Sequence, residues 1–116
     1  MEMSQVRPRG EGEAMKQITI PFKARFGRSM AEGMKTRTWR TRRYGIPGDE
    51  FVHDGVRYQL VVVEESVMGS VPEYYREEGF ADREDAIRTL EEIFPQNGYQ
   101  PERMGWAHWF MRVPME

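Results

Sequence analysis

Residues 35–43 read KTRTWRTRR and place five cationic side chains at nine positions, in a chain whose formal net charge is −2. If this basic segment is extended, alternate side chains point to opposite faces. One face then carries Lys35, Arg37, Trp39, Thr41 and Arg43, and the other carries Thr36, Thr38, Arg40 and Arg42. An interior strand would not carry cations on both faces, so we expect the segment to border a cleft or to lie at a sheet edge.

Two interpretations of the basic segment follow from its residue types. In the structural one, the segment is an edge strand whose arginines pair with the acidic residues of 64–92. In the functional one, it forms an anion site, because arginine binds phosphate through two parallel hydrogen bonds and Trp39 can stack on a nucleobase. The residue types by themselves leave both interpretations open.

Charge is distributed unevenly along the chain. Residues 23–43 carry eight bases and one acid, a balance of +7, whereas residues 44–102 carry 14 acids and four bases, a balance of −10. A protein with this asymmetry repels polyanions over most of its surface, so the pattern favours a local anion site over indiscriminate coating of nucleic acid.

The length of 116 residues predicts one domain, over residues 16–116. Residues 1–15 are polar, with interspersed Gly, Pro and Glu, and we expect them to form a flexible leader. The chain has no cysteine, which excludes disulfides and thiolate metal sites. No apolar run approaches the roughly 18 residues of a membrane span, and no signal peptide is evident, so we expect a cytoplasmic protein without a membrane partner.

Hydrophobic patterns on either side of the basic segment predict several strands. We expect strands over residues 17–22, 58–67 and 106–113. Asp54-Gly55 lies between apolar runs and predicts a hairpin in which Phe51 is opposite Tyr58. Residues 60–63 are apolar on both faces, which is typical of a central strand with both sides covered.

Two helices are predicted among these strands. Phe22, Phe26, Met30 and Met34 recur at intervals of four, and Gly33 is suited to end a short helix there. Residues 82–94 predict a longer helix with Asp82 as its cap. The order of elements indicates a small α+β domain, in which a twisted sheet of about five to six mostly antiparallel strands curls into a β-barrel with two or three helices at its ends.

A lysine and a threonine within the basic segment form a possible reactive pair. Lys35 follows Gly33 by two residues, where we expect a backbone kink. On a regular strand Lys35 and Thr38 face apart, so the two converge only if the backbone between them is irregular. A partly desolvated lysine beside a threonine hydroxyl can lose its proton and act as base to a threonine nucleophile.

Four short motifs occur in the order found in one known family. These are G-x-K-T-x-T-x-R (33–40), G-D-x-F (48–51), E-G-F (78–80) and a closing aromatic strand. Together they resemble the ASCH domain family, from about residue 17 to residue 113. The resemblance implies the PUA-like β-barrel fold, with a cleft between the G-x-K-T-x-T-x-R segment and the E-G-F loop that binds RNA or a modified nucleoside.

The resemblance also implies site residues. One branch of the family hydrolyses N4-acetylcytidine, and carrying its motif over makes Lys35 the base, Thr38 the nucleophile and Glu78 the group that orients the base or handles protons. Another branch has been linked to RNA cleavage. Side chains of the basic segment are the expected ligand contacts: Thr36, Arg37, Trp39, Arg40 and Arg43. Arg42 and Arg43 are equally suited to pair with the acidic half of the chain.

This chain departs from the deacetylating branch in its E-G-F sequence, its Arg42-Arg43 pair and its longer second helix, so binding is the preferred function and hydrolysis the alternative. A structural basic strand in a small globular domain is the third possibility. The two histidines, His53 and His108, are far apart in sequence and lack carboxylates at metal-ligand spacing. We therefore expect no metal and no cofactor, and the sequence does not specify an oligomeric state.

Overall fold

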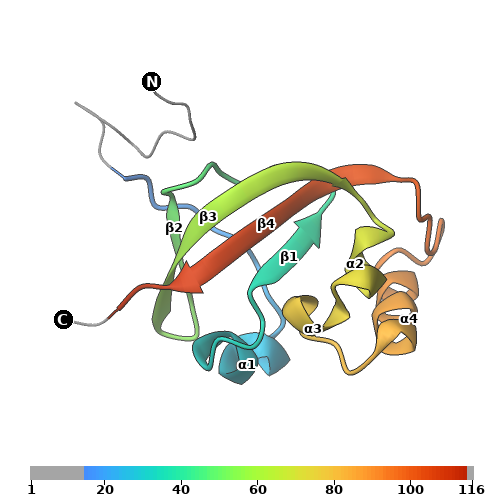
Figure 1. Cartoon of the computed structure of the whole chain (residues 1–116), viewed down its shortest axis with the longest axis horizontal. Coiled ribbons are helices and arrows are strands. Elements are labelled where there is room, and N and C mark those ends of the chain that lie inside the picture. Colours follow the sequence, from blue (N-terminus) through green and yellow to red (C-terminus); the bar gives the residue numbers. More distant parts are fainter. Residues whose placement is uncertain (1–14, 115–116) are drawn as a thin grey trace.

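The computed structural model describes residues 15–114, which form a curled antiparallel sheet with helices gathered beside one edge (Figure 1). The strand order is β1-β4-β3-β2. The strands are β1 (Arg37–Arg40), β2 (Glu50–His53), β3 (Val56–Val67) and β4 (Met104–Arg112). The predicted α+β class is confirmed, with four strands in this part of the chain instead of five or six. Of the predicted leader, residues 1–14 lie outside the described residues.

The hairpin between β2 and β3 is formed as the sequence predicts. Phe51 pairs with Tyr58, and the two turn residues have positive φ angles, 55° at Asp54 and 78° at Gly55. Two consecutive positive φ angles define the turn whose twist matches that of the flanking strands. The register places both aromatic rings inside the curled sheet, where they stack with centroids 5.4 Å apart.

The apolar run at residues 60–63 predicts that both faces of strand β3 are covered there. This prediction is wrong. Leu60 is buried, but Val61 and Val62 are exposed. The pairing with β4 shifts register between Leu60 and Val62. An irregularity of this kind bends the strand and interrupts its alternation, so successive valines lie on the outer face of the sheet.

The predicted strand at residues 17–22 is wrong. The segment makes one isolated bridge, between Gln17 and Glu50, instead of joining the sheet. Its backbone bonds go to the start of β2, where Ile18 N donates to the Glu50 carbonyl at 2.8 Å. Pro21 has no N–H to continue a ladder. Ile20 and Phe22 instead pack their side chains into the core.

Helices account for most of the remaining regular structure. They comprise a 3-10 turn (Ala24–Phe26), α1 (Gly27–Ala31), α2 (Ser70–Glu73), α3 (Tyr75–Glu78) and α4 (Arg83–Ile93). Asp82 caps α4 as predicted, accepting a hydrogen bond from Asp85 N at 2.7 Å. Met34 lies beyond the end of α1 and is exposed, contrary to the predicted helix face. The longest helix of residues 15–114 is α4, with 11 residues, and none there could span a membrane.

Two groups of buried side chains lie on opposite sides of β1. The sheet core fills the inside of the curl and consists of Ile20, Met30, Phe51, Tyr58, Leu60 and Phe110. The helix core lies under α2 and α4 and consists of Trp39, Met68, Val71, Ala86 and Leu90. Because side chains alternate along β1, Trp39 enters the helix core while Thr38 and Arg40 face the other side. This short strand is therefore the boundary between the two cores.

Candidate functional site

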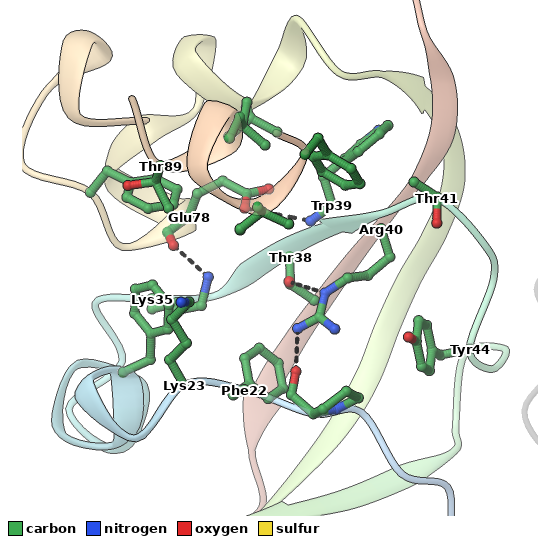
Figure 2. Close-up of a pocket in the computed structure, with 17 residues that line it drawn as sticks. Phe22, Lys23, Lys35, Thr38, Trp39, Arg40, Thr41, Tyr44, Glu78 and Thr89 are labelled. Carbon is green, nitrogen blue, oxygen red and sulfur yellow. Dashed lines mark hydrogen bonds between the residues drawn. The ribbon is translucent and has the colours of Figure 1, made fainter. Parts of the chain in front are cut away.

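A pocket of about 450 Å³ opens beside β1, at the boundary between the two cores (Figure 2). This volume falls in the range of roughly 300–1,000 Å³ that is typical of small-molecule sites. Its polar side chains include Lys35, Thr38, Arg40 and Glu78. Its aromatic side chains are Phe22, Phe26, Trp39, Tyr44, Phe80 and Phe94. The combination of apolar walls with a few convergent polar groups is typical of a ligand-binding site.

Lys35 reaches this pocket because it precedes the regular part of the strand. Gly33 has a φ of 80°, which turns the chain at the end of α1. The amides of Met34 and Lys35 both donate to the Ser29 carbonyl, and Thr36 N donates to the Glu77 carbonyl at 2.8 Å. Regular alternation begins only at Arg37. Lys35 and Thr38 therefore line one pocket, although a regular strand would place them on opposite faces.

The Lys35 amine is enclosed by backbone carbonyls and aromatic rings. Nζ donates to the Arg37 carbonyl at 2.9 Å and to the Glu78 carbonyl. It lies 4.6 Å from the centre of the Phe26 ring. The side chain is only 2% exposed, and this burial lowers the pKa of Lys35 to about 8. A substantial fraction of neutral amine is therefore present near physiological pH, as base chemistry requires.

Gly79 of the E-G-F motif is required for this arrangement. Its φ of 95° ends α3 in the left-handed conformation that favours glycine. A Cβ atom at this position would lie 3.0 Å from Lys35 Cδ and 3.1 Å from the Phe26 ring. A side chain here would be strained by the positive φ and would require the lysine stem or the Phe26 ring to shift by a few tenths of an ångström, so the motif glycine suits both the turn and the close approach of Lys35.

Thr38 and Arg40 form the opposite side of the pocket. Arg40 Nε donates to Thr38 Oγ1 at 3.0 Å, and Nη2 donates to the Pro21 carbonyl at 2.6 Å. The guanidinium lies between the Phe22 and Tyr44 rings, 4.9 and 5.6 Å from their centres. Because Thr38 Oγ1 accepts from Arg40, its own proton remains available for a ligand or a base.

Glu78 is held by a buried ion pair with Arg37. Arg37 Nη1 lies 3.0 Å from Glu78 Oε2, and Trp39 N donates to Oε1 at 3.4 Å. Burial raises the pKa of the Glu78 carboxyl, while the charges of Lys35 and Arg37 oppose that shift. Arg37 Nη2 also donates to the hydroxyls of Ser66 and Ser70. Arg37 thus ties β1 to β3, α2 and α3, and its side chain does not line the pocket.

The other predicted ligand contacts have different positions. Trp39 lines the pocket, although its indole Nε1 donates to the Ser66 carbonyl and its ring belongs to the helix core. Thr36 and Arg43 are not on the pocket wall. Arg43 lies over the Trp106 ring at 5.5 Å. Among carboxylates of residues 15–114, only Glu78 forms an ion pair with the basic segment, so pairing with residues 64–92 is limited to Arg37.

Several pocket residues were not predicted from the sequence. Phe22 and Phe26 were assigned to a helix face, and Tyr44 was not assigned a position. Thr89 and Leu90 reach the pocket from α4. A signal for Thr89 exists, since it is a polar residue on the buried face of an amphipathic helix, beside Ala86 and Leu90. The hydroxyl of Thr89 donates to the Asp85 carbonyl at 2.8 Å.

His108 braces the wall of the pocket from behind. Its Nε2 accepts a hydrogen bond from Tyr44 N at 3.0 Å, so Nδ1 carries the proton and donates to the Thr38 carbonyl at 3.2 Å. Burial lowers the pKa of this histidine to about 4. The neutral ring therefore joins β4 to β1 and to the chain at Tyr44. Among residues 15–114, no cluster of three His, Cys, Asp or Glu side chains could hold a metal ion.

Comparison with solved structures shows the same fold in protein EF3133 from Enterococcus faecalis V583, described under the family model DUF984. The TM-score is 0.59 at 20% sequence identity, and the match covers 90% of this chain and 78% of that chain. Similarity at this level shows the fold alone. No family model matches the sequence, and no curated protein matches it. The curled sheet with its helices is therefore a fold shared with a known protein.

The Arg37–Glu78 pair predicts a large loss of stability when one partner is removed. Arg37→Met leaves a buried carboxylate without its counter-ion, so we expect the free energy of unfolding to fall by about 3–5 kcal/mol. Arg57→Met is the matched control, since Arg57 is 57% exposed and also lies 3.0 Å from a glutamate, Glu50. We expect that change to cost less than about 1 kcal/mol. Urea unfolding measures both, and equal losses would contradict the assignment.

His108 predicts a pH-dependent stability. Because its folded-state pKa is about 4 against an ordinary 6.5, the unfolded chain binds this proton first as the pH falls. The free energy of unfolding should therefore decrease from pH 6.5 to pH 4. His108→Gln keeps an acceptor for Tyr44 N but does not titrate, so its decrease should be smaller. Urea unfolding at stepped pH tests this, with His53→Gln as control, and parallel slopes for wild type and His108→Gln would refute it.

Proposed function

We propose that this chain binds a nucleoside, either free or as an unstacked base of RNA, in the pocket beside β1. The observation that carries the proposal is the convergence of Lys35, Thr38, Arg40 and Glu78 on one aromatic-walled pocket. The resemblance of the chain to the ASCH domain family in four short motifs supports the same ligand class.

The chemistry of the pocket suits a planar heterocycle. Aromatic side chains from three parts of the chain offer ring faces and edges, among them Phe22, Phe80 and Phe94. Stacking of a base on such rings contributes about 1–3 kcal/mol per base. The Lys35 amine and the Thr38 hydroxyl supply a donor and a group that both donates and accepts, as recognition of the edge of a base requires.

The size of the pocket favours one base over a strand of nucleic acid. At about 450 Å³ it has the volume of a small-molecule site. Acidic residues dominate the chain from residue 44 to residue 102, so most of the surface repels a polyanion. Recognition is therefore concentrated in the pocket.

Binding can be measured by isothermal titration calorimetry with cytidine, uridine, adenosine, guanosine and N4-acetylcytidine. We expect Lys35→Met and Thr38→Val to weaken binding of the preferred nucleoside by about tenfold or more, since each removes a buried hydrogen-bonding group. Lys16→Met and Thr19→Val are matched changes at exposed positions outside the pocket. Binding of no nucleoside, or equal weakening by pocket and control changes, would overturn the proposal.

A second candidate function is hydrolysis of an N-acylated nucleoside such as N4-acetylcytidine. The specific observation that favours it is the buried Lys35 amine with a lowered pKa in the same pocket as the Thr38 hydroxyl. The neutral amine has two N–H groups, which match the two carbonyl acceptors, Arg37 and Glu78. Its lone pair then remains available to accept a proton.

The reaction would proceed through an acyl-threonine. Lys35 takes the proton of Thr38, whose Oγ attacks the acetyl carbon and forms an ester bond. The C–N bond breaks, and the proton on Lys35 passes to the departing amine. Water then hydrolyses the ester, releasing acetate and restoring the threonine. The Arg40 guanidinium, bonded to Oγ1 at 3.0 Å, favours the developing negative charge on this oxygen.

This alternative predicts a pH dependence of the rate. Because the neutral Lys35 amine is the base, kcat/KM for N4-acetylcytidine should rise with pH through about 8. Lys35→Met should lower kcat/KM by about 100-fold or more, and Thr38→Ala should abolish the acyl transfer. Chromatographic analysis of cytidine and acetate formation measures the rate, with Thr19→Ala as control. Turnover that is unchanged in Thr38→Ala would exclude the mechanism.

A further inference from the structure

We propose that the ligand is a nucleotide, and that Arg40 and Lys23 bind its phosphate at the mouth of the pocket. This inference rests on the proposed function, because it concerns the same pocket and adds an anionic group to the nucleoside. It is supported by the excess of cationic side chains on the pocket wall, together with the ion pairs and hydrogen bonds that these side chains form.

The pocket has more positive than negative charge. Three cations line it, Lys23, Lys35 and Arg40, together with one carboxylate, that of Glu78. That carboxylate forms an ion pair with Arg37, which does not line the pocket. Within residues 15–114, no carboxylate forms an ion pair with any of the three lining cations. Glu78 attracts Lys35 and Arg40 electrostatically, but in this part of the chain no carboxylate is in direct contact with any of the three lining cations.

This pattern is unexpected for a chain with 19 acidic and 17 basic residues. Removing a cation from water costs free energy unless a counter-ion or hydrogen bonds compensate. Burial lowers the pKa of Arg40, and the Tyr44 hydroxyl and Glu78 only partly oppose that shift. Hydrogen bonds to carbonyl oxygens compensate part of this cost for Lys35 and Arg40, and an anion bound in the pocket would add a counter-ion in direct contact.

Arg40 presents its remaining donors in a geometry suited to phosphate. Its guanidinium has five N–H groups, and the bonds to Thr38 Oγ1 and the Pro21 carbonyl use two of them. The rings of Phe22 and Tyr44 lie 4.9 and 5.6 Å from its centre and restrict its orientation (Figure 2). A guanidinium fixed in this way binds phosphate oxygens with little further loss of side-chain freedom.

The three cations differ in depth. Lys35 is buried at 2% exposure, Arg40 is half-buried, and Lys23 is exposed on the segment that follows Phe22. A nucleoside in contact with Lys35 therefore extends its substituents toward Arg40 and Lys23. A nucleotide carries its phosphate on the ribose. With the base toward Lys35, the phosphate is therefore the group expected at the pocket mouth, where solvent reaches it.

The test compares cytidine and N4-acetylcytidine with their 5′-monophosphates by isothermal titration calorimetry at constant ionic strength. We expect each monophosphate to bind about tenfold or more tightly than its nucleoside, as charge-assisted hydrogen bonds provide. In Lys23→Ser and Arg40→Gln this advantage should shrink to less than about threefold, since each variant removes one phosphate partner.

Arg88→Gln is the matched control, since Arg88 is an exposed cation of α4 outside the pocket lining. Circular dichroism verifies that each variant is folded. Equal affinity for nucleoside and monophosphate, or an advantage that survives in both variants, would overturn the phosphate site while the proposed function stands. Absence of binding by both ligand types would overturn the proposed function and this inference together.

Discussion

The ion pair between Arg37 and Glu78 is the interaction on which the rest of the site depends. The Glu78 carboxylate bonds to Arg37 and to the Trp39 amide. The backbone carbonyl of Glu78 accepts a hydrogen bond from Lys35 Nζ. One residue at the end of α3 thus fixes the start of β1 on two sides. Buried ion pairs contribute little net stability compared with well-packed apolar groups, but loss of one partner is costly. The pair therefore specifies the arrangement of these elements more than it stabilises the fold.

The position of β1 between two cores explains why a pocket forms beside it. A strand of four residues, Arg37–Arg40, cannot cover both the sheet core and the helix core along their whole length. Trp39 fills the helix side, and the opening beside Thr38 remains lined by aromatic rings from both cores. The polar groups that enter this opening are kept in place by backbone carbonyls, namely those of Pro21, Arg37 and Glu78.

Local signals in the sequence were sufficient for part of this structure. The Asp54-Gly55 turn and the Asp82 cap depend on residues adjacent in the chain, and both were predicted correctly. The segment 17–22 was predicted as a strand because alternation cannot distinguish pairing from packing. In the candidate site, the sequence indicated Lys35, Thr38 and Glu78 through a family resemblance. The sequence could not show that Arg37 forms a buried ion pair whereas Arg40 lines the pocket, since their partners are as many as 41 residues away in the chain.

The hydrogen bonds of His108 determine which neighbouring side chains can be substituted without moving the pocket wall. The histidine bonds only to main-chain atoms, the Thr38 carbonyl and the Tyr44 amide, on either side of residues 41–43. Those three residues are exposed, and this bracing of the path of the chain does not involve their side chains. Substitutions at Thr41, Arg42 and Arg43 therefore leave the hydrogen bonds of His108 intact, and a change at Thr41, which lines the pocket, can alter the pocket wall without disturbing them.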